Sequence, residues 1–283
     1  MSVATAPALT VRWHNKSALP GFGLTLGFTL FYLSAIVLVP LTALLIRPWS
    51  LGFQSFLAEI AAPRVVHALD LSFSASAIAA AINSVMGLLV AWVLVRYRFP
   101  LHRLVDAIID LPFALPTAVA GIALSALYAQ TGWIGAPLAR AGLKVAYTPL
   151  GVVVALVFIG LPFVVRTIQP VLADAGREPE EAAATLGATR WQAFHRVVLP
   201  ALAPALITGT GLAFARAVGE YGSVIFIAGN LPMRSEIAPL LIVIKLEEYD
   251  YAGAAAIGGV MLGLSFLMLF ALNGVQAWMA ARK

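Results

Sequence analysis

EPEEAAATLGATRWQAFHRVVLP, residues 178–200, is the stretch of this sequence with the strongest structural signal. Its first half predicts a short helix, because glutamates favour the positive end of a helix and alanines are strong helix formers. Gly187 predicts the end of that helix in a left-handed turn. Thr189 predicts the cap of a second short helix, which leads to Leu199 and Pro200. We therefore expect two short helices joined at Gly187.

The composition of the whole chain is that of a membrane protein. Of its 283 residues, 61% are hydrophobic and only 11% are charged, and the mean hydropathy is +0.93. A soluble domain has about 25% charged and about 45–50% apolar residues. The chain contains no cysteine, which excludes disulfides, thiolate metal sites and cysteine nucleophiles. Its formal charge of +5 comes from basic residues spread between apolar runs, so no nucleic-acid surface is predicted.

Long apolar runs predict an all-α integral membrane protein with a single transmembrane domain over residues 1–283. A spanning helix needs about 20 mostly apolar residues, because a rise of about 1.5 Å per residue must cross about 30 Å of hydrocarbon. Pro112 and Pro116 fall in the first turns of the third span, where a missing N–H costs no hydrogen bond. The six predicted spans lie at about 22–46, 67–95, 111–129, 148–166, 201–227 and 252–278.

Basic residues in the connections predict how the spans are oriented, because Lys and Arg accumulate in cytoplasmic loops. With both termini in the cytoplasm, the cytoplasmic segments hold eleven basic residues and the opposite loops hold six. The eleven are Arg12, Lys16, Arg96, Arg98, Arg103, Arg166, Arg177, Arg190, Arg196, Arg282 and Lys283. The six are Arg47, Arg64, Arg140, Lys144, Arg234 and Lys245. We therefore expect both termini in the cytoplasm, which requires an even number of spans.

The spacing within residues 178–200 resembles the EAA signature of bacterial ABC-importer permeases. The matching residues are Glu181, Ala182, Ala183, Gly187, Val197, Leu199 and Pro200. The family usually has isoleucine where this chain has Val197. The resemblance implies that residues 177–199 form a cytoplasmic coupling segment that docks in a cleft of an ATP-binding subunit. Glu181 would contact that subunit and Gly187 would permit the tight turn. An ordinary connecting pair of helices is the alternative.

Three further stretches extend the resemblance over most of the chain. They are LPFALPTAVAGIAL (111–124), FARAVGEYGSVIFIAGNLP (214–232) and LEEYDYAGAAAIGGVML (246–262). All three are similar to the T-type permease subunits of sulfate/thiosulfate importers, and the first two are also similar to molybdate permeases. The resemblance implies the six-helix type I ABC importer (MetI-like) fold, a location in the bacterial inner membrane and transport by alternating access.

The same resemblance implies a set of partners. They are a second, W-type permease subunit, two copies of a cytoplasmic ATP-binding subunit and a periplasmic sulfate-binding protein, besides the lipid bilayer. The chain has no Walker A sequence, so we expect a transport subunit that is not itself an enzyme. It would bind no cofactor, and the partner would use ATP and Mg²⁺. Import of molybdate, tungstate or another oxyanion is the alternative.

Two charged residues lie inside the fifth predicted span. Arg216 and Glu220 are four residues apart, so they lie on one face of a helix and can pair. A charge inside the bilayer costs about 2.5–3.5 kcal/mol on insertion scales, so it faces a partner or a water-filled path. One interpretation is a structural ion pair. The other places the pair in the anion path near a gate, together with Tyr221, Gly222 and Ser223.

The remaining polar residues give weaker signals. We expect Asp106 and Asp110 to balance Arg103 at the cytoplasmic start of the third span. Residues 236–251 predict either a gate helix at the outer interface or a docking surface for the binding protein. Four scattered histidines without cysteine predict no metal site.

Three other classes of function fit the sequence less well. A membrane enzyme would need a nucleophile or metal motif, and the sequence has neither G-x-S-x-G nor H-E-x-x-H. A secondary transporter driven by an ion gradient often shows inverted repeats and paired broken helices, and neither is clear in this sequence. A structural scaffold leaves the EAA signature unexplained.

Overall fold

The computed structural model describes residues 21–280, with side chains described as far as residue 277. Over these residues the chain is all-helical. Four of the basic residues behind the predicted orientation, namely Arg12, Lys16, Arg282 and Lys283, lie outside the described residues. Five helical segments are long and apolar enough to cross a membrane. They are Phe22–Leu51, Pro63–Arg96, Pro149–Asp174, Arg190–Val218 and Tyr251–Ala277.

The chain divides into two units, residues 1–46 and 47–283. In the first unit, α1 (Phe22–Leu33), the π-helical turn η1 (Ser34–Leu38) and α2 (Val39–Ile46) follow one another without a break. The wide turn ends two residues before Pro40, whose missing N–H removes a bond of the α-helical ladder. These helices bury none of their described side chains, so the apolar ones need lipid or protein around them.

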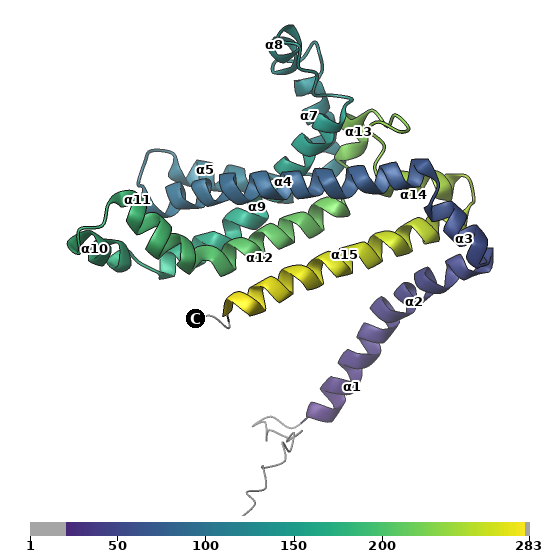
Figure 1. Ribbon diagram of the computed structural model, residues 1–283, viewed down its shortest axis with the longest axis horizontal. Coiled ribbons are helices and arrows are strands. Elements are labelled where there is room, and N and C mark those ends of the chain that lie inside the picture. Colours follow the sequence, from purple (N-terminus) through teal and green to yellow (C-terminus); the bar gives the residue numbers. More distant parts are fainter. Residues whose placement is uncertain (1–20, 281–283) are drawn as a thin grey trace, which may run out of the picture. The chain divides into compact units, whose positions relative to one another are not determined.

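Three long helices form the core of the second unit. α4 (Pro63–Arg96), α9 (Pro149–Asp174) and α12 (Leu199–Val218) lie side by side (Figure 1). The unit begins with the 3₁₀ turn η2 (Arg47–Leu51) and α3 (Phe53–Ile60). Its other elements are α5 (His102–Ile109), α6 (Leu111–Ala114), α7 (Thr117–Tyr128), α8 (Gly135–Arg140), α10 (Glu178–Thr185), α11 (Arg190–Ala193), the π-helical turn η3 (Phe194–Val198), α13 (Val224–Ala228), α14 (Ala238–Glu247) and α15 (Tyr251–Ala280).

The core helices approach closely where one of them carries glycine. A Cβ at Gly87 of α4 would lie 2.7 Å from Cγ1 of Val164, in α9. A Cβ at Gly209 of α12 would lie 3.0 Å from Cα of the same valine. Val164 is fully buried. Small residues that let helix backbones approach are typical of packing in membranes, where burial of apolar surface does not drive helices together.

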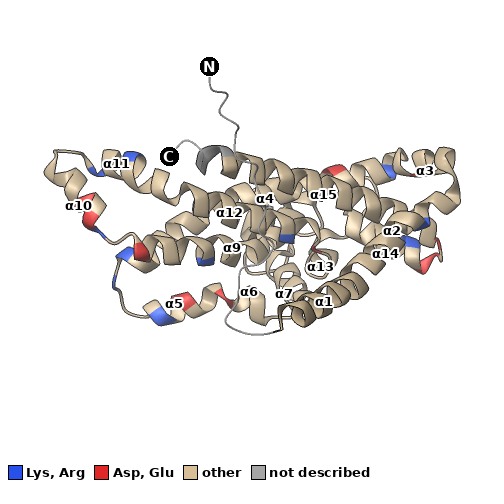
Figure 2. Ribbon diagram, turned by 90° about the horizontal axis from the view of Figure 1, so that it is seen from below, with Lys and Arg blue, Asp and Glu red and all other residues tan. Residues whose placement is uncertain are grey.

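The charged side chains of the second unit gather towards the two ends of its long helices (Figure 2). Between those ends the outward surface is largely apolar. On α15, for example, Phe266, Leu267 and Phe270 are all more than half exposed. A bilayer imposes this distribution, because it accepts apolar side chains and excludes unpaired charge.

The third predicted span is interrupted. Residues 111–129 form α6 and α7, which are separated at Leu115. Leu115 is extended, with ψ 136°, because the residue before a proline is disfavoured in the α conformation. α7 is apolar but has only 12 residues, and by itself it is too short to cross about 30 Å of hydrocarbon. A sixth crossing therefore stays a prediction.

The fifth predicted span combines two helices. α12 ends at Val218, and the chain turns over residues 219–223 before α13 begins. The turn is closed by the buried carboxylate of Glu220, which accepts hydrogen bonds from the backbone N–H and the hydroxyl of Ser223, both at 3.0 Å. The prediction of one continuous helix over 201–227 is therefore wrong, since apolar composition alone does not show this turn.

Arg166 of α9 attaches the segment that follows α4 to the core. Its guanidinium lies 2.6 Å from a carboxylate oxygen of Asp106 and 2.6 Å from one of Asp110. The expected pairing of both aspartates with Arg103 is therefore wrong. Burial alone would raise the pKa of the Asp106 carboxyl, but hydrogen bonds from Arg166 and Gln169 outweigh it and hold that pKa below its ordinary value.

The Arg166→Ala substitution is expected to destabilise the second unit. It leaves two partly buried carboxylates next to each other without their cation, at a cost of about 1–2 kcal/mol given their partial exposure. Thermal unfolding of the detergent-solubilised protein measures the change. Arg103→Ala is the matched control, because Arg103 forms no ion pair within residues 21–280. Equal melting temperatures for the two variants would contradict the assignment.

Candidate functional site

Residues 177–199, the predicted coupling segment, fold into two short helical pieces joined at Gly187, as predicted. α10 ends two residues earlier, and Gly187 adopts the left-handed conformation with φ +82°. The turn is closed by a hydrogen bond of 3.0 Å from the Ala188 N–H to the carbonyl of Ala183. A Cβ at Gly187 would meet no atom within 4 Å, so the conformation and not the space requires glycine.

Thr189 caps the second piece, as predicted. Its hydroxyl accepts a hydrogen bond from the Gln192 N–H, and the Gln192 side chain accepts one of 2.8 Å from the Thr189 N–H. This reciprocal pair is a capping box. α11 then continues through the π-helical turn η3 into α12, and the wide turn falls directly before Pro200. The second piece is thus continuous with a long helix of the core.

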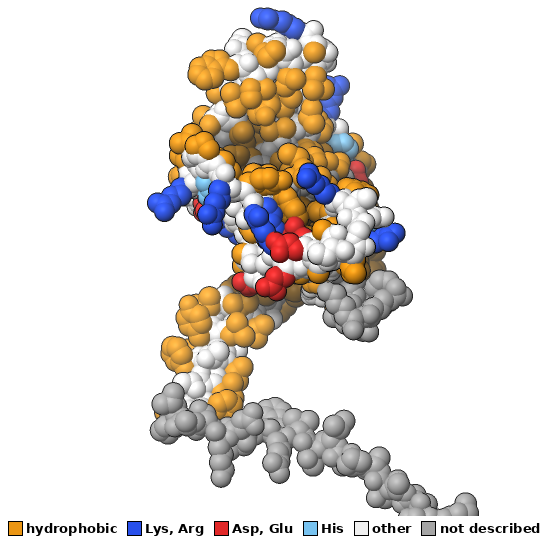
Figure 3. All heavy atoms as spheres, turned by 90° about the vertical axis from the view of Figure 1, so that its left-hand side faces the viewer, with side chains coloured by type: hydrophobic (Ala, Val, Ile, Leu, Met, Phe, Trp, Pro, Cys, Tyr) orange, Lys and Arg blue, Asp and Glu red, His pale blue; other side chains and the backbone are white. Residues whose placement is uncertain are grey.

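The turn of the coupling segment presents apolar side chains to its surroundings. Leu186 is 88% exposed and Trp191 is 69% exposed. Glu181 is also exposed. Figure 3 looks onto the end of the second unit that holds α10 and α11, where charged side chains of both signs gather among apolar ones. An exposed apolar patch with a polar rim is typical of a protein interaction site.

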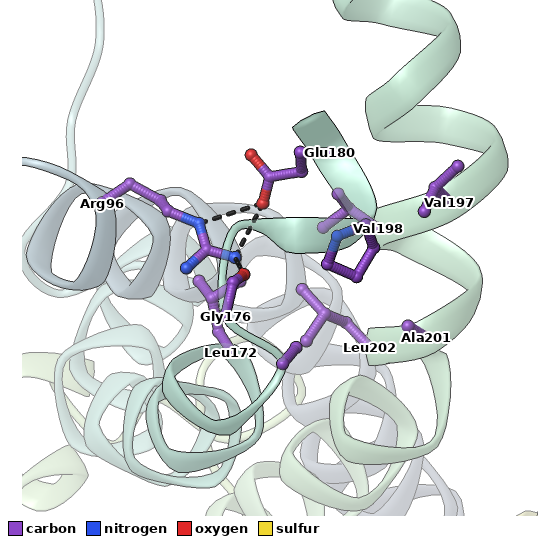
Figure 4. Close-up of a pocket in the computed structure, with 10 residues that line it drawn as sticks. Arg96, Leu172, Gly176, Glu180, Val197, Val198, Ala201 and Leu202 are labelled. Carbon is purple, nitrogen blue, oxygen red and sulfur yellow. Dashed lines mark hydrogen bonds and ion pairs between the residues drawn. The ribbon is translucent and has the colours of Figure 1, made fainter. Parts of the chain in front are cut away.

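Arg96, the last residue of α4, connects the coupling segment to the core (Figure 4). Its Nε and Nη2 donate to one carboxylate oxygen of Glu180 at 3.0 and 2.7 Å, and Nη2 also donates to the carbonyl of Gly176 at 2.6 Å. Arg177 donates in return to the carbonyl of Arg96 at 2.6 Å. The Arg96 side chain is only 8% exposed.

Two hollows lie beside this cluster. The first is mainly apolar and is drawn in Figure 4. It is lined by Arg96, Leu172, Ala175, Gly176, Pro179, Glu180, Val197, Val198, Ala201 and Leu202. The second is wider and more polar, and Glu181 lies in its wall together with Trp92, Arg96, Tyr97, Arg177, Glu180, Ala184 and Arg190. The residue that the resemblance assigns to contact with an ATP-binding subunit therefore borders an open groove.

The predicted intramembrane pair forms at the end of α12. Arg216 Nη2 lies 2.5 Å from Glu220 Oε2, and the glutamate side chain is 1% exposed whereas the arginine side chain is 36% exposed. The next residues pack tightly against α7, because a Cβ at Gly222 would collide with the Thr117 hydroxyl. Tyr221 is half-buried and Ser223 is fully buried against Glu220. The structure thus brings the five predicted path residues together, and their role stays a prediction.

Several polar groups of this structure lack a clear signal in the sequence. Arg96 and Glu180 are 84 residues apart, and only the fold brings them together. Asn83 of α4 is 1% exposed and faces Gly160 of α9, and neither polar atom of its side chain has a hydrogen-bond partner within the described residues. The one sequence signal for such a pair is a charged residue in the signature region, such as Glu180, because it suggests an oppositely charged partner elsewhere in the chain.

The segment 236–251 is anchored by ion pairs at both ends. The carboxylate of Glu236 is 1% exposed and accepts two hydrogen bonds from Arg64, at 2.8 and 2.6 Å. Lys245 lies 2.7 Å from Glu59 and 2.9 Å from Asp250. The hydrogen bond from Lys245, helped by the Gly253 N–H, holds the pKa of the Asp250 carboxyl below its ordinary value. Both the gate and the docking interpretation of this segment stay predictions.

No group of three or more potential metal-ligating residues occurs within the part of the chain that was described. This agrees with the composition, which includes no cysteine and only four histidines.

Known proteins with similar sequences are transport permeases. Residues 83–282 match the family described as "Binding-protein-dependent transport system inner membrane component". The chain is 49% identical over 263 residues to the "Sulfate transport system permease protein CysT" of Escherichia coli (strain K12), covering 93% of this chain and 95% of that protein. It is 50% identical over 250 residues to the protein of the same name from Synechocystis, covering 88% and 87%.

Solved structures with a similar fold are ABC importers. A bacterial alginate ABC transporter in complex with a periplasmic protein has a chain that matches with a TM-score of 0.72 at 18% identity, covering 89% of this chain and 92% of that one. The MetNI methionine ABC transporter in an inward-facing conformation matches with a TM-score of 0.58 at 18% identity, covering 76% and 95%. The all-helical fold expected from the resemblance is confirmed. This chain therefore has the fold of a type I ABC importer permease and belongs to the family of binding-protein-dependent transport system inner membrane components.

Proposed function

We propose that this chain is a permease subunit of an ATP-driven importer that moves sulfate or thiosulfate across the bacterial inner membrane by alternating access. It works with a second permease of the W type, two copies of a cytoplasmic ATP-binding subunit and a periplasmic sulfate-binding protein. The chain itself binds no cofactor, and ATP and Mg²⁺ are used by the partner. ATP binding draws the coupling segments together, and the spanning helices then open the path towards the binding protein.

The observation that carries this proposal is the shape of residues 177–199. Two short helices meet at a left-handed glycine, apolar side chains project at the turn, and Glu181 borders a groove. A compact projection of this kind suits a cleft in a partner protein. The second helix continues into α12, so a force applied to the projection reaches the spanning helices directly.

The substrate class rests on the curated relatives. These relatives are named as sulfate transport permeases, and the match covers nearly the full length of both chains. Because about half of the residues are identical over this length, we expect the residues around the transport path to be similar in this chain and its relatives. The alternative is import of molybdate or another oxyanion, and the experiment described below would give a different result in that case.

The pair Arg216–Glu220 suits the path of a divalent anion. The Arg216 side chain is 36% exposed, and its guanidinium pairs with the buried carboxylate of Glu220. A path must bind the ion firmly enough for it to enter and weakly enough for it to leave. A partly exposed cation whose charge is balanced by a buried carboxylate satisfies both needs. This role remains part of the proposal.

The complex, reconstituted in liposomes with the binding protein, is expected to take up labelled sulfate only with ATP. Excess unlabelled thiosulfate should compete, whereas molybdate should compete weakly. A variant of the ATP-binding subunit that cannot hydrolyse ATP is the control and should abolish uptake. Uptake that persists in this control but stops when ion gradients collapse would indicate a secondary transporter. Stronger competition by molybdate than by thiosulfate would reassign the substrate.

Glu181→Ala is expected to weaken the docking of the ATP-binding subunit. The substitution removes one exposed charge without touching the core, so the permease should keep its melting temperature. Uptake should fall by about fivefold or more, as for loss of about 1 kcal/mol of coupling. Glu178→Ala is the matched control, because Glu178 is an exposed glutamate of the same helix outside the signature. Equal uptake by the two variants would contradict a docking role for Glu181.

The double variant R216Q/E220Q tests the path. Glutamine at 220 still accepts hydrogen bonds from Ser223, so the turn after α12 should fold. Uptake is expected to fall by about tenfold or more, a change of about 1.4 kcal/mol in the barrier, because the anion loses its cation. The control is Arg103→Gln, which removes the charge of an arginine that forms no ion pair within residues 21–280. If assembled R216Q/E220Q complexes took up sulfate at the parent's rate, the pair would have a structural role and no role in the path.

A further inference from the structure

The coupling segment is held to the core by few contacts. None of the residues of α10 is buried, so packing contributes little to its position. Its link to α9 passes through Gly176, which has φ +61°, and the mainly apolar hollow shown in Figure 4 lies between α10 and the core helices. A helix attached in this way pivots easily unless specific bonds fix it.

Arg96 supplies those bonds. Within the described residues, the ion pair with Glu180 is the one salt bridge between α10 and a core helix. The guanidinium also binds the carbonyl of Gly176, at the pivot itself, and Arg177 binds the carbonyl of Arg96. Charge-assisted hydrogen bonds are stronger than neutral ones, and the strength increases when the side chain is shielded from water, as it is for Arg96.

Aromatic contacts connect Arg96 to the second helical piece of the coupling segment. The Arg96 guanidinium lies 5.5 Å from the ring centre of Trp92, one turn earlier on α4. The ring of Trp92 meets that of Phe194 edge to face, with centres 5.6 Å apart. The end of α4 thus contacts both pieces of the coupling segment, α10 through Glu180 and η3 through Phe194.

We propose that Arg96 is a positioning residue that fixes the coupling segment to α4, so that the segment and α4 move as one body during transport. The inference rests on the proposed function, because only docking of an ATP-binding subunit would move the segment. α4 is 34 residues long, about 50 Å at about 1.5 Å per residue. A displacement at its cytoplasmic end therefore reaches the opposite membrane surface without passing through a flexible joint.

The test uses the whole complex reconstituted with the binding protein. Arg96→Ala and Glu180→Ala are expected to keep the ATP-binding subunit bound and basal ATP hydrolysis intact. The stimulation of hydrolysis by sulfate-loaded binding protein should fall about fivefold or more. The exchanged pair R96E/E180R should recover part of it, because it restores the ion pair but no donor to the Gly176 carbonyl; a general loss of stability would allow no recovery. Arg98→Ala is the matched control and should behave as the parent, because Arg98 forms no ion pair within residues 21–280.

A second measurement does not depend on how the variants fold. The chain has no cysteine, so spin labels at Y97C and E178C, both exposed positions, report one distance between the end of α4 and α10. We expect that distance to stay unchanged between the nucleotide-free and ATP-trapped complexes. A shift in the peak of the distance distribution would overturn the proposal, and so would single variants that retain the parent's stimulation or an exchanged pair that recovers none.

If the parent complex binds no ATP-binding subunit, the proposed function fails and Arg96 has no coupling role. If the parent is stimulated and the single variants equal it, only the role of Arg96 fails.

Discussion

The close contact of α4, α9 and α12 is the constraint on which the rest of the structure depends. Val164 of α9 contacts both Gly87 and Gly209: a Cβ at Gly87 would clash with it at 2.7 Å, and a Cβ at Gly209 would force it to shift from 3.0 Å. Closely packed interiors resist gradual deformation, because a small shift brings many atoms into collision. The three helices therefore behave as one block, and every functional element described above is attached to an end or an edge of it.

Charged residues make those attachments. Arg166 holds the segment of α5 and α6, Arg96 holds the coupling segment, and Arg64 holds the chain before α14. In each case the arginine lies on a helix of the block, and its carboxylate comes from a segment outside the block. Arginine suits this use, because its planar group makes several hydrogen bonds at once and stays charged when partly buried. Apolar contacts hold the block together, and ion pairs orient the parts around it.

The sequence predicts the helices and their ends better than the contacts between them. The turn at Gly187 and the cap at Thr189 follow from local residue preferences, and both are present. The pair Arg216–Glu220 follows from the spacing of four residues, and it forms although α12 ends at Val218 and Glu220 lies in the turn that follows. Partners on different elements, such as Arg96 with Glu180, depend on how the chain folds back. Nearness in sequence to Arg103 suggested the wrong partner for Asp106 and Asp110, whereas Arg166 lies on another helix.

A block that does not deform restricts where motion can occur during alternating access. Switching must then use joints whose backbone tolerates change, and the structure has them on the borders of the block. Gly176 and Gly229 adopt positive φ at the ends of α9 and α13, and a π-helical turn leads into α12. Asn83 shows that the contact of α4 with α9 is stable despite a cost, because a buried amide without partners opposes folding by about 1–3 kcal/mol. The packing around Asn83, which is 1% exposed, must offset this cost, so the contact of α4 with α9 belongs to the rigid part of the block.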